Sequence, residues 1–167
     1  MLILNAMKRL ITITTMLILL YAVTFGEDVV AKGQTFSAMG DYTLVKNDQK
    51  VLWMGKDCQS YTIRYANSPA NVRIIVCKDP GCRRYVVLSD KLCIQYVCNS
   101  NYFGVEKLDS KFEAEGYKTD YDKINRFEYF HQKVIGPGQK TEIEATSLIA
   151  AFFPLLVKPE GLPGAAI

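Results

Sequence analysis

The sequence predicts an all-β fold, an antiparallel β-sandwich or barrel of about 7–9 short strands stapled by disulfides. Short runs rich in β-branched and aromatic residues alternate with turn-forming residues over positions 41–108. All five cysteines lie between positions 58 and 98, inside this region. An apolar leader precedes it, which indicates an oxidising compartment where disulfides persist.

The leader begins with two cations, Lys8 and Arg9, and continues almost wholly apolar over residues 10–25. Because small residues, Thr24 and Gly26, lie at its end, we predict that residues 1–26 form a signal peptide cleaved before Glu27. An uncleaved anchor is the alternative. The apolar run is shorter than the ~20 residues that a spanning helix needs, which favours cleavage.

Leader removal leaves a mature chain close to neutrality. Residues 1–26 hold two cations and no acidic residue, so the formal net charge falls from +3 to +1. Nucleic-acid binding needs a basic stripe or face, and the sequence shows none. We therefore expect a secreted protein with no nucleic-acid partner and no stable membrane span after leader cleavage. Its expected partner is an unidentified extracellular protein or glycan.

The mature chain divides by composition. The signal peptide (1–26) is followed by a small, polar N-terminal arm (27–40), a β-domain (41–145) and a C-terminal apolar tail (146–167). The strands expected in the first part of the β-domain are bounded by turn signals at regular spacing. They cover residues 41–46, 49–54, 59–65, 71–77, 83–88, 92–98 and 102–108.

The C-terminal third is less regular. Residues 109–125 mix charges of both signs and are expected to be a surface excursion. Residues 126–135 and 141–145 are predicted as two further strands, separated by a Gly-Pro-Gly turn. The apolar run 148–157 is expected to pack on the sheet as a short helix or strand. Exposure for association with a partner or membrane, or removal as a propeptide, are alternatives for this run.

The cysteine spacing gives a strand register, because opposed residues in a hairpin lie at equal distances from the turn centre. Turn centres chosen from the sequence place Cys58 opposite Cys77, Cys77 opposite Cys82, and Cys82 opposite Cys98. Disulfides need Cα atoms within ~7 Å. We favour the bridges Cys58–Cys77 and Cys82–Cys98, which leave Cys93 as a free thiol. A Cys77–Cys82 bridge across the tight turn is the main rival.

The same register sorts side chains onto two faces. The cysteine row is expected to share its face with Ile94, Tyr96 and three arginines, with the run 148–157 as partial cover. The opposite face is more apolar and should be the core. Cys93 falls on that face, where a buried thiol is small, apolar and inert. The expected core face holds Tyr61, Ile63, Tyr65, Val72, Ile74, Val76, Tyr85, Val87, Cys93 and Val97.

No catalytic constellation stands out in the sequence. His131 is the only histidine, which argues against a multi-histidine metal site and limits histidine-based catalysis. The spacing of Cys77 and Cys82 resembles a metal knuckle only superficially, because an oxidising compartment favours disulfides. We expect no metal, no cofactor and no enzymatic activity.

A few side chains are candidates for contact with a ligand. Arg64, Arg73 and Arg84 share the cysteine face and are able to face an anion, although arginines on a solvated sheet mostly serve solubility. Tyr102 and Phe103 lie beside a turn and suit recognition of protein or sugar surfaces. Trp53 is expected in the core, with its indole N–H bonded to the backbone.

These features favour a secreted, non-catalytic recognition or defence-type binding module. One alternative is an extracellular structural or assembly protein that self-associates through residues 148–157. Another is a secreted hydrolase or inhibitor whose site the sequence does not reveal.

Overall fold

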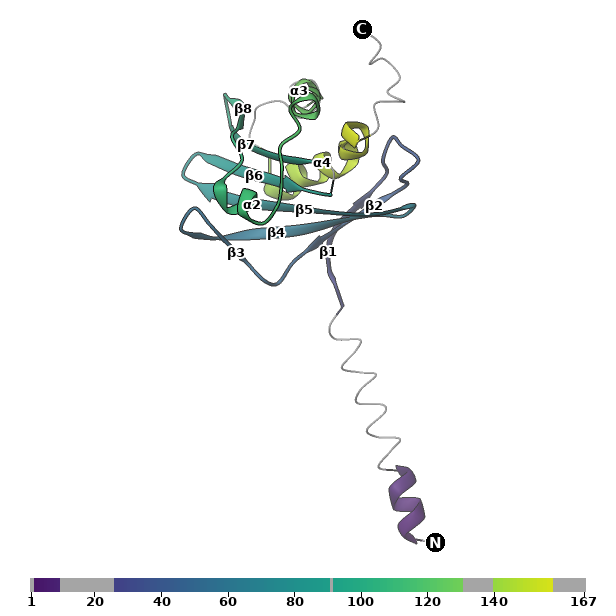
Figure 1. The fold of residues 1–167 in the computed structure, drawn as a ribbon. Coiled ribbons are helices and arrows are strands. Elements are labelled where there is room, and N and C mark those ends of the chain that lie inside the picture. The colour runs from purple at the N-terminus through teal and green to yellow at the C-terminus, as the bar shows by residue number, and fades with distance from the viewer. Residues whose placement is uncertain (1, 10–25, 91, 131–139, 158–167) are drawn as a thin grey trace.

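The computed structural model describes residues 2–9, 26–90, 92–130 and 140–157. Residues 2–9 are helical, and the body of the molecule is an antiparallel sheet of eight strands with a few short helices (Figure 1). The strands are β1 (Asp28–Gly33), β2 (Tyr42–Lys46), β3 (Val51–Trp53), β4 (Lys56–Tyr65), β5 (Ser68–Asp79), β6 (Cys82–Leu88), β7 (Cys93–Asn99) and β8 (Phe103–Glu106). The helices are α2 (Ser110–Ala114), α3 (Tyr121–Phe130) and α4 (Glu142–Val157).

The strands form one open sheet in the order β1-β2-β4-β5-β6-β7-β8, and β3 pairs with β4. β2 and β3 follow one another along β4, and the β3–β4 turn is Met54-Gly55, with φ of 55° and 71°. Within the described residues the outer strands β1 and β8 do not pair, so the sheet does not close and the expected sandwich or barrel is not seen. Part of the expected arm, residues 28–33, is the edge strand β1.

The β4–β5 register is the expected one, although the turn is not. Gln59 pairs with Val76, which places Cys58 beside Cys77 at the next position. Tyr65 pairs with Ser68, two residues earlier than Ala70, the partner that the predicted turn centre requires, and a β-bulge between Ile63 and Tyr65 restores the register. A bulge puts extra residues into one strand of a pair, and here β5 advances four residues from Val72 to Ser68 against two on β4, which compensates for the displaced turn.

The next two predicted registers are wrong. Asp79 pairs with Cys82 across the two-residue turn Pro80-Gly81, so Cys77 faces Arg84 and not Cys82. Cys82 pairs with Asn99 and not with Cys98. Because side chains alternate along a strand, this one-residue slip sends every β7 side chain to the other face from the one predicted.

The larger apolar core lies on the face covered by α3 and α4 (Figure 1). Ile94 and Tyr96 belong to this face, in contrast to the prediction, because of the β7 slip. Phe153 of α4 stacks on Tyr65 at 6.3 Å between ring centroids. The residues expected on the core face from β4, β5 and β6 are all buried in this cluster, namely Tyr61, Ile63, Tyr65, Val72, Ile74, Val76, Tyr85 and Val87.

A second, smaller core lies on the other face and contains three cysteines. Phe112 of α2 is fully buried there and packs edge-on against Trp53, at 5.6 Å between ring centroids. Residues 109–125 are therefore more than a surface excursion, and α2 provides the cover that was expected from residues 148–157. Cys93 belongs to this face and not to the predicted one. The cluster consists of Trp53, Cys58, Ile75, Cys77, Val86, Leu88, Cys93, Leu108 and Phe112.

Two predicted strands are helices. α3 buries Ile124 and Phe127, three positions apart, which is helical spacing. α4 begins with a reciprocal capping box, in which Thr141 Oγ1 accepts from the Glu144 backbone N–H and Glu144 Oε2 accepts from the Thr141 N–H. β-branched and aromatic residues in both segments suggested strands, and tertiary packing overrides that propensity. Residues 131–135 of the first predicted strand lie outside the described residues.

No helix in the described ranges has both the length and the apolar character needed to cross a bilayer. Most of the predicted leader, residues 10–25, lies outside those ranges.

The second core predicts a large effect of truncating Phe112. Phe112→Ala should lower the free energy of unfolding by about 3–5 kcal/mol, because it empties a fully buried aromatic site beside Trp53. Urea unfolding monitored by Trp53 fluorescence measures this change. Phe36→Ala is the matched control, since Phe36 is 62% exposed and its loss should cost less than about 1 kcal/mol. Equal losses for the two variants would contradict burial of α2.

Candidate functional site

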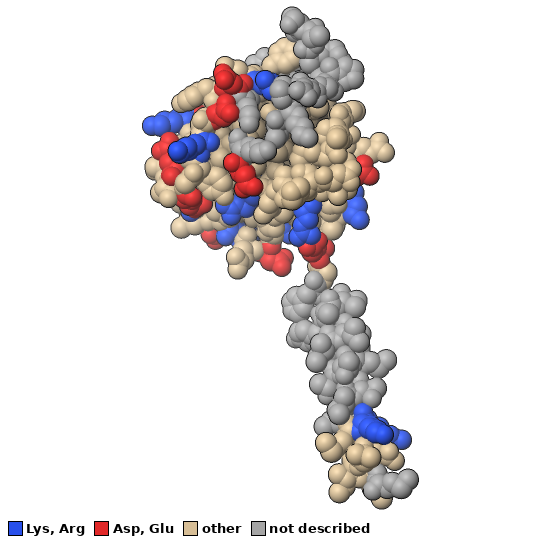
Figure 2. Space-filling model, turned by 45° about the vertical axis from the view of Figure 1, so that its right-hand side comes forward, with Lys and Arg blue, Asp and Glu red and all other residues tan. Residues whose placement is uncertain are grey.

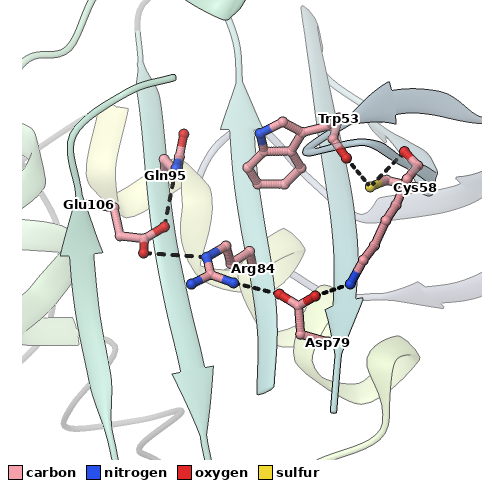
Figure 3. Close-up of polar contacts among 7 residues, drawn as sticks. Trp53, Cys58, Asp79, Arg84, Gln95 and Glu106 are labelled. Carbon is pink, nitrogen blue, oxygen red and sulfur yellow. Dashed lines mark hydrogen bonds and ion pairs between the residues drawn. The ribbon is translucent and has the colours of Figure 1, made fainter. Parts of the chain in front are cut away.

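A ladder of polar side chains crosses the second face of the sheet (Figure 3). The Asp79 carboxylate pairs with the Lys56 ammonium through Oδ1 and with the Arg84 guanidinium through Oδ2, the latter at 2.5 Å. Arg84 Nε also contacts Glu106 Oε1 at 3.4 Å, and Gln95 Nε2 donates to Glu106 Oε2 at 3.1 Å. The five side chains come from β4, β5, β6, β7 and β8, so the ladder ties five strands together.

The ladder neutralises its own charges. The hydrogen bond from Lys56, supported by Arg84, holds the pKa of Asp79 below its usual range. Gln95 Oε1 accepts from the Asp109 backbone N–H at 2.9 Å, which connects the ladder to the start of α2. With every charge paired, the ladder is suited to fixing strands and positioning neighbours.

Two buried thiols lie beside the ladder. Cys58 and Cys77 are 2% and 1% exposed, and the Cys58 Sγ–H donates to the Trp53 and Lys56 carbonyl oxygens at 3.5 and 3.6 Å. Burial, with the hydrogen bond to Cys77, raises the pKa of Cys58 to about 12. Such a thiol is protonated and unreactive at neutral pH.

All five cysteines are free thiols in the structure. Cys82 opposes Asn99 and Cys98 opposes Arg83, so their side chains point to opposite faces of the sheet and the predicted row of four cysteines is broken. The prediction for the Trp53 indole is also wrong, because within the described residues its buried N–H has no hydrogen-bond partner.

A cleft of about 780 Å³ opens where β4 begins, β5 ends and α4 starts; we call it the charged-end cleft. Five cationic side chains line it: Lys46, Lys50, Lys56, Lys78 and Arg83. Three carboxylates also line it: Asp28, Asp57 and Glu142.

Glu142 is the buried acidic group of this cleft, at 8% exposure. The Tyr61 hydroxyl donates to Glu142 Oε1 at 2.5 Å, and the Lys78 ammonium lies 2.5 Å from Oε2. Burial and this carboxylate raise the pKa of Tyr61 well above its usual value, so the phenol keeps its proton. The capping box of α4 holds Glu142 in the first turn, directly over β4 and β5.

Lys46 and Lys50 are exposed, and neither lies within ion-pair distance of a carboxylate among the described residues. Both are therefore placed to receive an anion at the mouth of the cleft. Sequence reasoning missed this arrangement because Tyr61 and Glu142 are 81 positions apart. The Thr141/Glu144 capping box was the one local signal that could have identified the helix start.

The three candidate arginines share a sheet face, as expected, but the structure does not gather them into one site. Arg64 pairs with Glu27, Arg73 lies 3.8 Å from Glu115, and Arg84 belongs to the ladder. Each guanidinium thus faces a carboxylate of its own, which weakens the case for a shared anion site.

The two aromatic candidates lie in different environments, one exposed and one packed against the core. Tyr102 is 56% exposed at the β7–β8 turn. Phe103 points into the larger core, where its ring lies 5.3 Å from Tyr96 and 6.1 Å from Phe127. Surface recognition by aromatic side chains at this turn would therefore rest on Tyr102.

Within the described part of the chain, no three His, Cys, Asp or Glu side chains gather at metal-binding distances. His131 lies outside that part. In the view of Figure 2, charged side chains of both signs lie mainly on the left and along the lower edge of the body.

We compared the chain with models of protein families, with curated proteins and with solved structures, and none of the three comparisons yields a match. The function proposed below therefore rests on the residues and contacts of this chain.

The ladder predicts a pH-dependent effect of Asp79→Asn. Because the folded-state pKa of Asp79 is lowered, its ion pairs stabilise the fold above the unfolded pKa of ~4, and this contribution is lost as pH falls through the folded value. The variant should therefore have a lower urea midpoint than the wild type at pH 7 and the same midpoint near pH 2. Asp48→Asn, an exposed change outside the ladder, is the control. A midpoint difference that persists undiminished in acid would contradict the ion-pair role.

Proposed function

We propose that this protein is a secreted, non-catalytic recognition module that binds an anionic group of an extracellular partner in the charged-end cleft. The observation that carries the proposal is that Lys46 and Lys50 line that cleft without lying within ion-pair distance of a carboxylate among the described residues. Glu142 is already paired with Lys78 and Tyr61, so it opposes an incoming anion less than an unpaired carboxylate would. Lys46 and Lys50 supply the first contacts.

The chemistry of the cleft favours binding over catalysis. General acid–base and nucleophilic catalysis need groups whose pKa lies near the working pH. The two groups of the cleft wall that are strongly perturbed, Tyr61 and Cys58, have pKa values raised far above neutrality. Both therefore serve as hydrogen-bond donors and packing groups.

Self-association through residues 148–157 is less well supported. Phe153, Leu155 and Leu156 of this run are buried within the molecule, at 1–3% exposure, and Phe153 and Leu156 pack in the core under α4. Because these apolar side chains are buried inside the molecule, α4 leaves few of them exposed for contact with a partner.

Secretion is the second part of the proposal, and it rests on the leader and on the cysteines. β1 starts at Asp28, so cleavage before Glu27 leaves the whole sheet intact. In an oxidising compartment we expect Cys58 and Cys77 to be joined before folding buries them, by thiol–disulfide exchange with a small or protein disulfide, which leaves as two thiols.

A non-reducing peptide map of protein collected from the culture medium tests this part. It should show Glu27 as the N-terminus, Cys58 linked to Cys77, and free thiols at Cys82, Cys93 and Cys98. An intact N-terminus on cell-associated protein would overturn secretion. A Cys82–Cys98 link would contradict the β6–β7 register, whose residues 82 and 98 lie on opposite faces.

Removing the two exposed cleft lysines should weaken anion binding. Lys46→Gln with Lys50→Gln should reduce the affinity for heparin, used as an anionic probe, by about 2- to 30-fold, since exposed ion pairs contribute roughly 0.2–1 kcal/mol each. Elution from a heparin column at rising salt gives a first measure, and calorimetry gives the affinity.

The matched control removes the same charge elsewhere. Lys32→Gln with Lys107→Gln changes two exposed lysines that do not line the cleft. If both double variants lose the same affinity, binding follows net charge and the cleft is not the site. Failure of the wild type to bind at low salt would also overturn the proposal.

A further inference from the structure

The far end of the sheet differs sharply from the charged-end cleft. Residues 34–40, 66–72 and 145–157 contain no charged side chain. The β4–β5 turn puts residues 66–72 at the opposite end of these strands from Cys58 and Cys77. The side of the molecule that comes forward in Figure 2 shows a wide area without charged side chains.

The three uncharged segments, together with Ser89 and Asp90 of the β6–β7 turn, line a pocket of about 510 Å³, which we call the uncharged-end pocket. Met39, Ala70 and Phe153 give it an apolar wall, and Asn67, Asn71 and Asp90 bring polar groups to it. Pockets for small molecules have volumes of roughly 300–1,000 Å³, with mostly apolar walls and a few polar groups that fix orientation. Size and lining both fit that description.

The loop on one side of the pocket is held by its own hydrogen bonds. Thr35 Oγ1 donates to the Gly40 carbonyl at 2.6 Å, and the Asn67 N–H donates to the Met39 carbonyl at 2.9 Å. Gly40 has φ of +78°, and a Cβ there would lie 2.7 Å from Asn67 Nδ2. The glycine thus allows the Asn67 amide to sit against the loop, which positions this polar group at the pocket.

The other walls are equally well fixed. Phe153 stacks on Tyr65, whose hydroxyl donates to the Ala150 carbonyl at 2.9 Å, so the aromatic wall is anchored to both β4 and α4. Ser89 closes the β6–β7 turn, with its N–H donating to the Leu92 carbonyl at 2.9 Å. A pocket whose walls are already ordered loses little conformational entropy when a ligand enters.

We propose that the uncharged-end pocket binds a small uncharged ligand with an apolar body and at least one hydrogen-bonding group. The apolar body packs against Met39, Ala70 and Phe153. The amides of Asn67 and Asn71 both donate and accept hydrogen bonds, so they suit a neutral hydroxyl or carbonyl. Among the lining residues that the structure describes, Asp90 is the one charged group, and it repels an anion, which separates this site from the charged-end cleft.

The test uses the neutral fluorescent probe N-phenyl-1-naphthylamine and its anionic relative 1-anilinonaphthalene-8-sulfonate, both titrated into the secreted protein. The wild type should enhance the fluorescence of the neutral probe at saturable stoichiometry. Ala70→Leu fills the pocket and should weaken that binding at least about tenfold. Ala114→Leu, the same change on the exposed end of α2, should leave it unchanged.

Two further variants keep the proposal open to contradiction if Ala70→Leu fails to fold. Asn71→Asp, at an exposed position, adds a charge to the rim and should weaken the neutral probe several-fold. Asp90→Asn should strengthen the anionic probe and leave the neutral probe unchanged. The absence of probe binding by the wild type, or binding insensitive to both Ala70→Leu and Asn71→Asp, would overturn the proposal. Lys46→Gln with Lys50→Gln should not affect binding of the neutral probe, so the proposals for this pocket and for the charged-end cleft are tested independently.

Discussion

The pairing of β4 with β5 is the constraint on which the rest of the structure depends. β5 is buried continuously from Ile74 to Cys77, so it faces a core on both sides of the sheet. A strand buried on both faces tolerates no register slip, because a shift of one residue would exchange the two cores. The bulge between Ile63 and Tyr65 preserves this register although the turn is displaced by one residue.

The two ends of this hairpin have different chemistry for the same reason. At the Cys58–Cys77 end, β5 continues into Lys78 and Asp79, which reach Glu142 and Arg84 respectively. At the turn end, uncharged residues meet the uncharged loop 34–40 and α4. One strand pair therefore separates the cleft that we propose for anions from the pocket that we propose for neutral molecules, and the polar ladder ties the neighbouring strands together.

Much of the sheet could be predicted from local pattern, and the errors have identifiable physical causes. The alternation along β4, β5 and β6 assigned Tyr61, Ile74 and Tyr85 to the larger core correctly. The predicted register of β7 was wrong because it depends on the exact turn after Leu88, and the sequence Ser-Asp-Lys does not specify one turn geometry. The buried hydrogen bond between Tyr61 and Glu142 could not be predicted, since no local signal links residues 81 positions apart.

The sequence by itself determined the antiparallel, β-rich character of this protein, because alternation of apolar and polar residues acts within a single strand. It also indicated the β4–β5 pairing, because the turn signal near Asn67 and the alternation along both strands together favour this register, although a bulge is needed to reach it. Only the tertiary structure decided which face α4 covers, that α2 buries Phe112 against Trp53, and which charges meet in the cleft. Those outcomes depend on packing between segments distant in the chain, where shape and burial outweigh local propensity.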